Sequence, residues 1–105
     1  MKKPLILSTL FALTLSGMVS AQEYEVGQKN KEFTKKSLTI KAGDTVKFTN
    51  EDPFFHNVYS LSDVSTFDLG SYPQGQSKSV TFDTAGEIDV DCAIHPNMHM
   101  HIVVE

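Results

Sequence analysis

One short segment of this chain carries most of the side chains that bind soft metal ions. Residues 92–101 hold the single cysteine, three of the four histidines and two methionines, in the order Cys92, His95, Met98, His99, Met100 and His101. The fourth histidine, His56, stands alone far upstream. Thiolate, imidazole and thioether donors together favour copper, Cu(I) especially, over hard ions. Two imidazoles, one thiolate and a long axial thioether are the donor set of a blue-copper electron-transfer site.

The spacing of these donors indicates which of them share one metal ion. Cys92, His95 and Met98 would come from one loop at the end of a strand, and His56 from a distant strand. Pro96, directly after His95, fixes one backbone angle and stiffens that loop. A site of this kind suits both oxidation states of copper, so an electron enters or leaves with little movement of the ligands.

The two methionines are separated by the alternation of the last strand. Met100 falls on the same face as the apolar residues that follow it, so we expect Met100 in the core and Met98 as the axial ligand. His99 and His101 fall on the opposite face, where we expect them to be exposed to solvent. Two surface histidines at this spacing also leave open a weak additional metal site.

Alternation with a period of two recurs along the chain, and no segment shows the 3.6-residue period of an amphipathic helix. The alternating segments are residues 38–40, 46–48, 80–82, 88–92 and 98–104. Turn-forming residues separate them, and short strands at roughly ten-residue spacing predict an all-β fold, an antiparallel β-sandwich. Cys92 lies in phase with the apolar positions before it, so its sulfur should face the interior. Residues 61–66 fit either a loop or a helical turn.

The first 21 residues have the features of a cleaved export signal. Two lysines precede an apolar stretch over residues 5–15, and small residues follow at Val19-Ser20-Ala21. The apolar stretch is short for a membrane span, and no cysteine follows it that a lipid could modify. We therefore expect a signal peptide over residues 1–21 and one domain over residues 22–105, exported to the periplasm without a membrane anchor.

Composition excludes several classes of protein. The 105 residues include thirteen acidic side chains and nine basic ones, all lysines, for a formal charge of −4. Loss of the two lysines in the signal makes the charge −6. A nucleic-acid-binding protein would need a basic face, and a disordered chain would be less apolar than 40%. An exported domain with one cysteine forms no internal disulfide, so Cys92 needs another role. The single thiol also excludes a binuclear copper centre with two bridging thiolates.

These residues resemble the cupredoxins, the family of type 1 copper proteins, and within it the amicyanin branch. The resemblance covers nearly the whole mature region and lies in residues 38–46, Asn50, Asp52, His56-Asn57-Val58, 67–70, 80–82 and Cys92-x-x-His95-Pro96-x-Met98. It implies a Greek-key β-sandwich of eight strands. One copper ion would be held by His56, Cys92, His95 and Met98. It also implies electron transfer from a periplasmic dehydrogenase to a c-type cytochrome, with no catalytic residues; we expect a monomer.

Two positions in the ligand loop depart from that pattern. Asn97 stands where amicyanin-like chains carry a bulkier apolar residue, and Ala93 follows the cysteine where relatives often have a hydroxyl residue. Asn57, the expected anchor between the two ligand segments, would then bond backbone groups only. An apolar patch around His95, through which the electron would leave, is expected from Pro53, Phe54 and Pro96.

Three functions are compatible with these residues. The first is a one-electron carrier, and the second is a copper carrier or chaperone that uses the donor-rich residues 98–101. The third is a catalytic or sensing copper protein with an open coordination position, which requires that Met98 does not bind. A structural zinc site at His56, Cys92 and His95 is chemically reasonable, but a fourth thioether donor argues against it.

Overall fold

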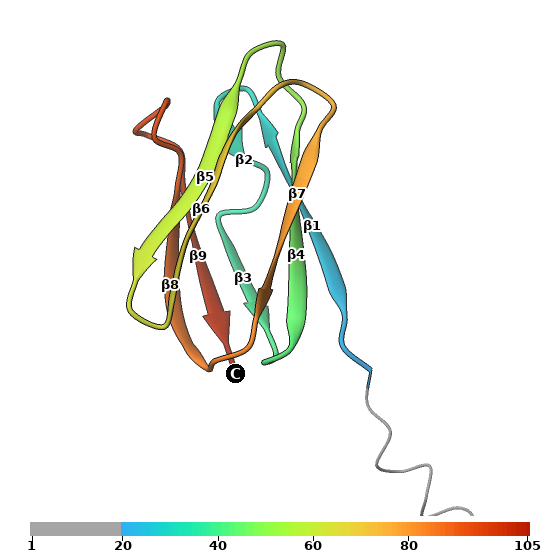
Figure 1. The fold of residues 1–105 in the computed structure, drawn as a ribbon, viewed down its shortest axis with the longest axis vertical. Coiled ribbons are helices and arrows are strands. Elements are labelled where there is room, and N and C mark those ends of the chain that lie inside the picture. Colours follow the sequence, from blue (N-terminus) through green and yellow to red (C-terminus); the bar gives the residue numbers. More distant parts are fainter. Residues whose placement is uncertain (1–19) are drawn as a thin grey trace, which may run out of the picture.

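The computed structural model describes residues 20–105, which form two β-sheets packed face to face (Figure 1). The strands are β1 Glu23–Lys29, β2 Glu32–Phe33, β3 Ser37–Ile40, β4 Asp44–Asn50, β5 His56–Ser62, β6 Ser65–Tyr72, β7 Ser77–Phe82, β8 Gly86–Asp91 and β9 His99–Val104. Residues 1–19 of the expected signal peptide lie outside the described part of the chain. From residue 20 onward there is no helix able to cross a membrane.

Each sheet combines antiparallel neighbours with one parallel pair. The four-stranded sheet has the order β2-β1-β4-β7, and the five-stranded sheet has the order β3-β9-β8-β5-β6. β1 runs parallel to β4 and β3 runs parallel to β9, whereas the other pairs are antiparallel. The chain crosses to the opposite sheet between the two strands of each parallel pair, so neither pair is closed by a hairpin. The predicted all-β sandwich is confirmed, and both sheets are mixed.

Residues 61–66, which fitted either a loop or a helical turn, form the end of a tight hairpin instead. Ser62 at the end of β5 pairs with Ser65 at the start of β6, and two turn residues lie between them. Leu61 points outward with 77% of its surface exposed, so no apolar face marks this part of β5 in the sequence. Residues 20–105 form nine strands, one more than the expected eight, and they include the two-residue β2, which pairs with the end of β1.

The predicted apolar faces meet between the sheets. In β4, Val46 and Phe48 are buried and alternate with half-buried Thr45 and Lys47. The core consists of Val26, Phe33, Ile40, Val46, Phe48, Val58, Tyr72, Phe82, Ile88, Val90, Cys92, Met98, Met100, Ile102 and Val104. Removing a large apolar side chain of this kind from water contributes about 1.5–3 kcal/mol. Val80, predicted on an apolar face, packs against this core from a partly exposed position.

Strand directions bring the two predicted ligand segments to one end of the sandwich. β5 and β8 are antiparallel neighbours, with Tyr59 paired to Asp91. The beginning of β5, at His56, therefore lies beside the end of β8, from which Cys92 follows. The ligand loop, residues 92–98, leaves at that same end and returns as β9 (Figure 1).

Candidate metal centre

Three side chains from the two segments point their donor atoms at a common space. The Cys92 sulfur lies 3.9 Å from Nδ1 of His56 and 3.9 Å from Nδ1 of His95, and the two nitrogens lie 3.1 Å apart. His56 and Cys92 are buried, whereas His95 is half-buried. The structure thus brings together three of the four residues predicted as ligands.

The size of this triangle fits a metal ion at its centre. With bonds of about 2.0 Å to nitrogen and 2.3 Å to sulfur, an angle at the metal of about 105° separates two nitrogens by roughly 3.2 Å, and an angle of about 125° separates nitrogen from sulfur by roughly 3.8 Å. The observed separations of 3.1 Å and 3.9 Å agree with these values. At this distance the two imidazole nitrogens either share one N–H or direct both lone pairs at a common cation, and the Cys92 sulfur is placed to bind the same cation.

A buried carboxylate fixes the ring of His56. Nε2 of His56 donates to Oδ2 of Asp52 at 2.7 Å, which leaves Nδ1 free to face Cys92 and His95. Ligand histidines commonly donate their second ring N–H to a carboxylate, which sets the tautomer and the ring orientation. Sequence reasoning noted Asp52 only within the cupredoxin resemblance. Asp52 lies in the irregular segment between β4 and β5, where no regular spacing signals a contact with His56.

Asp52 is itself held by backbone amides. Asn30 donates to one carboxylate oxygen at 2.8 Å and Lys31 to the other at 3.0 Å, both from the turn between β1 and β2. Burial raises the pKa of Asp52, but the hydrogen bonds from Lys31, His56 and Asn30 outweigh it, and the pKa lies below its usual value. Asp52 is therefore ionised and remains a strong acceptor for the His56 ring.

The Cys92 sulfur and the ligand loop are anchored by Asn57. The Asn57 amide donates to the sulfur at 3.4 Å, and the Asn57 side-chain oxygen accepts from the amide of Ala93 at 3.1 Å. We expected Asn57 to bond backbone groups only, and this expectation is wrong. Its side-chain nitrogen also donates to Oδ1 of Asp68 on β6 at 3.0 Å, because a register shift between β5 and β6 lies at this point.

His95 lies at the surface among apolar groups. The ring of Phe54 lies 5.3 Å from the His95 ring, which confirms that one expected member of the patch is in contact. Two exposed apolar side chains that the sequence analysis did not consider flank the ligands: Phe55 beside His56, 54% exposed, and Ile94 beside His95, 46% exposed. Burial, with help from the charges of His56 and Lys31, lowers the pKa of His95. A neutral imidazole is the form that binds a metal.

The remaining donors of residues 98–101 divide between the two faces of β9. Met98 and Met100 are both fully buried. Met98 precedes the strand, and its amide donates to the carbonyl of His95 at 2.9 Å, so the loop closes in one tight turn. His99 and His101 lie on the outer face, with side chains 51% and 35% exposed. The run therefore does not present its donors as one group.

Comparison with known proteins agrees with this geometry. The profile of the copper-binding proteins of the plastocyanin/azurin family matches residues 20–105. Amicyanin from Paracoccus versutus is 31% identical over 90 residues, which cover 83% of this chain and 68% of that protein. Amicyanin from Paracoccus denitrificans is 35% identical over 71 residues, 65% of this chain and 54% of that protein.

Solved structures show the same relationship. A Cu(I) form of an amicyanin methionine variant superposes with a TM-score of 0.73 at 28% identity, covering 86% of this chain and 88% of that one. A copper-containing nitrite reductase from Thermus scotoductus SA-01 gives a TM-score of 0.75 at 28% identity, but this chain spans only 23% of it. Fold, donor set and sequence agree: the chain belongs to the plastocyanin/azurin family of copper-binding proteins, and its cofactor is one type 1 copper ion.

Proposed function

We propose that this protein is a one-electron carrier whose copper ion is held by His56, Cys92, His95 and Met98 and alternates between Cu(II) and Cu(I). The observation that carries the proposal is the convergence of two imidazole nitrogens and one sulfur, from two segments, on one buried space. A soft thiolate beside two imidazoles suits both oxidation states of copper.

The surroundings of the donors keep them in place during electron transfer. Asp52 fixes the ring of His56, and Asn57 holds the Cys92 sulfur and the start of the loop. Pro96 and the turn from His95 to Met98 stiffen the rest of the loop. Little nuclear movement therefore accompanies the change in oxidation state, which is the property a fast carrier needs.

Met98 would supply the fourth ligand, a thioether, because it closes the turn that begins at His95. Met100 is equally buried but lies within β9, paired with Val90 of β8 and packed into the apolar core. Cys92, His95 and Met98 follow one another at intervals of three residues, so one short loop provides the thiolate, the imidazole and the thioether.

The electron would enter and leave through His95. It is the one ligand of the triangle that is partly exposed, and Phe54, Phe55 and Ile94 provide apolar surface around the ligand loop. Such a surface allows close, short-lived contact with another redox protein. Following the amicyanin resemblance, the donor would be a periplasmic dehydrogenase and the acceptor a c-type cytochrome, with the mature protein exported as a monomer.

A carrier is favoured over the two alternatives. A chaperone that uses residues 98–101 would need their donors on one side, whereas Met98 and Met100 face the core and His99 and His101 face outward. The copper-containing nitrite reductase among the structural matches is matched over only 23% of its own length, so the match covers one part of that enzyme. The hollow on the outer face, lined by Tyr59 and Leu61 among others, includes none of the three converging donors.

The test is an absorption spectrum of the mature protein loaded with Cu(II), followed by cycles of reduction and reoxidation. An intense visible band from thiolate-to-copper charge transfer, bleached reversibly by reduction, is the expected result. Cys92→Ser should abolish the band, while the control Ala93→Ser, which changes the same loop but no donor, should keep it. A colourless Cu(II) complex in the wild-type protein would contradict the proposal.

A further inference from the structure

An exposed carboxylate on the edge strand β6 contacts the residue that anchors the thiolate ligand. Oδ1 of Asp68 accepts a hydrogen bond from Nδ2 of Asn57 at 3.0 Å. Asn57 also bonds to the Cys92 sulfur through its main-chain amide and to the amide of Ala93 through its side-chain oxygen. A connected series of hydrogen bonds therefore runs from the edge of the five-stranded sheet to a proposed copper ligand.

A β-bulge places this carboxylate. Between two regular pairs of β5 and β6, Leu69 and Gly70 of β6 face a single residue of β5. Gly70 has a φ of 75°, which glycine adopts without steric cost, and Lys78 donates to the carbonyl of Leu69 at 2.9 Å. Bulges are frequent at sheet edges and beside functional sites, where they redirect a side chain. The bulge in β6 brings the side chain of Asp68 within reach of Asn57.

The carboxylate determines which way the side-chain amide of Asn57 is turned. An amide has its donor on one side and its acceptor on the other, so it accepts from Ala93 only when its nitrogen points away from the loop. Asp68 receives that nitrogen, and its Oδ1 is held in turn by the amide of Gly70 at 2.8 Å. Ala93 has no side-chain hydroxyl that could replace this acceptor. Loss of the carboxylate would therefore allow the Asn57 side chain to turn away from the loop.

We propose that Asp68 is a positioning residue for the thiolate ligand, and that it acts through Asn57, which holds the start of the ligand loop and donates to the Cys92 sulfur. The inference rests on the proposed copper centre, because it concerns the sulfur of one of its ligands. Hydrogen bonds around the cysteine sulfur tune the reduction potential of a type 1 site. An N–H group directed at the sulfur withdraws electron density from it and so favours Cu(I).

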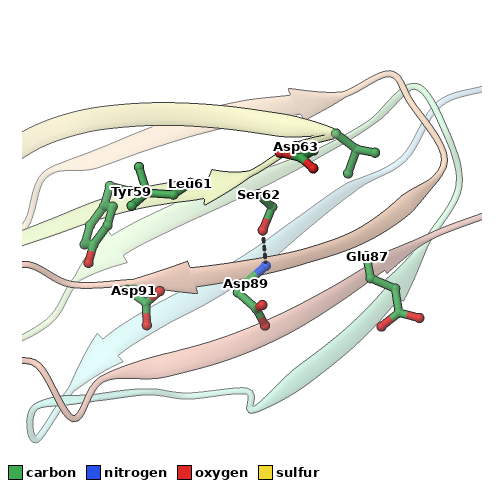
Figure 2. Close-up of a pocket in the computed structure, with 8 residues that line it drawn as sticks. Tyr59, Leu61, Ser62, Asp63, Glu87, Asp89 and Asp91 are labelled. Atoms are coloured by element: carbon green, nitrogen blue, oxygen red, sulfur yellow. Dashed lines mark hydrogen bonds between the residues drawn. The ribbon is translucent and has the colours of Figure 1, made fainter.

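The two ends of this connection differ in burial. Asn57 is only 6% exposed, whereas Asp68 is exposed. Replacement of Asp68 therefore opens no cavity in the core, and its effect on the ligands passes through the hydrogen bond or through the charge. Asp63 separates these two effects, because it is an exposed carboxylate of the same hairpin. Figure 2 shows Asp63 beyond the end of β5, past Tyr59 and Leu61, on the side away from Asn57.

The first test measures amide hydrogen exchange by NMR in the copper-free mature protein. In Asp68→Ala the amide of Ala93 should exchange at least about fivefold faster, as expected when one hydrogen bond is lost, while the amides of β8 and β9 keep their rates. Asp68→Asn retains an oxygen acceptor and should stay close to the wild-type rate. Asp63→Asn is the matched control for charge and should leave the rate unchanged.

The second test measures the reduction potential of the copper-loaded variants. Asp68→Ala and Asp68→Asn remove the same negative charge, so a difference between them reports the hydrogen bond. We expect the lower potential in Asp68→Ala, because a looser N–H contact leaves more electron density on the Cys92 sulfur and stabilises Cu(II). Asp63→Asn should change the potential less than either variant, because its charge lies farther from the ligands.

Unchanged exchange at Ala93 in Asp68→Ala would overturn the proposal. Faster exchange along the whole of β5 and β6 would contradict it as well, since Asp68 would then stabilise the hairpin and not the ligand loop. Equal potentials in the two Asp68 variants, or an equal shift in Asp63→Asn, would reduce its influence to a diffuse effect of charge. Hydrogen exchange is recorded without copper, so failure of the proposed electron carrier and failure of this positioning role are distinguishable.

Discussion

His56 donates one ring nitrogen to the buried carboxylate of Asp52, 2.7 Å away, and presents the other to Cys92 and His95. The carboxylate in turn accepts two backbone amides from the β1–β2 turn. The orientation of one proposed copper ligand is therefore set by a turn at the opposite end of the sequence from the ligand loop.

Asp52→Asn tests this dependence. The amide still accepts a hydrogen bond but lacks the charge, so the His56 ring is held less firmly and is a weaker base. We expect copper affinity to fall about 10–100-fold, measured by competition with a chelator. Glu51→Gln, which removes the same charge from an exposed neighbouring residue, should leave affinity unchanged. Equal loss in both variants would mean that charge alone, not ring orientation, is responsible.

Separate replacement of the two buried methionines identifies the axial ligand. Met98→Ala should shift the visible spectrum and the reduction potential, because a thioether donor is lost. Met100→Ala should leave both unchanged while lowering the free energy of unfolding by about 2–5 kcal/mol, as expected for a cavity in a packed core. The reverse pattern, with the spectrum responding only to Met100→Ala, would assign the axial position to Met100.

The apolar surface beside His95 should control electron exchange between copies of the protein. Ile94→Lys places a charge next to the exposed ligand and should slow electron self-exchange at least about tenfold, since close approach then requires desolvation of the ammonium group. The same change at the exposed Leu61, which lines the separate outer hollow, alters net charge equally and should have little effect. Line broadening in NMR spectra of mixed oxidation states gives both rates. Equal slowing in the two variants would argue against exit through His95.

The stability of the fold should depend on pH through the carboxylate of Asp44. Its carboxylate accepts from the amides of Gln22 and Lys41, each at 2.9 Å, and these bonds hold its pKa below 3.8. A pKa that is lower in the folded state adds stability above the unfolded value, and this stability is lost as pH falls through the folded value. Asp44→Asn should therefore lower the melting temperature at neutral pH, with a difference that closes in acid. A constant difference between pH 2 and 7 would contradict this account.

Gln28 is a fully buried amide, and within residues 20–105 neither its side-chain oxygen nor its nitrogen has a hydrogen-bond partner. A buried polar group without partners costs about 1–3 kcal/mol. Gln28→Met, of similar shape, should raise the free energy of unfolding by about 1 kcal/mol, measured by urea denaturation of the copper-free protein. A decrease would show that ordered water binds the amide.

Strands with one apolar face were predictable from the sequence, and others were not. Val46 and Phe48 alternate with polar residues and mark β4, and the same holds for the faces of β8 and β9. In β1 the buried positions are Val26, Gly27 and Gln28 in succession, so no period of two appears. β6 lies at the edge of its sheet, and all of its residues except Tyr72 are at least partly exposed. Its sequence therefore has no fully buried apolar face from which the strand could be predicted.

The proposed ligands were predictable because donor types are rare and chemically specific, whereas their supports depend on tertiary structure. Asn57 reaches Asp68 only because the pairing of β5 and β6 shifts beside it. Asp91 and Asp89 lie beside His99 and His101 only through the register of β8 and β9. Neither relationship has a sequence period that would reveal it.

The last strand of the chain occupies an interior position, between β3 and β8 in the five-stranded sheet. Ile102 pairs with Leu38 on one side and with Ile88 on the other, so β9 joins segments that are far apart in the sequence. Such non-local pairing makes folding slow and closely cooperative. The five-stranded sheet cannot close until β9 is in place, and the ligand loop, residues 92–98, directly precedes that strand. The closing of the sheet by β9 therefore also fixes the position of the loop that carries Cys92, His95 and Met98.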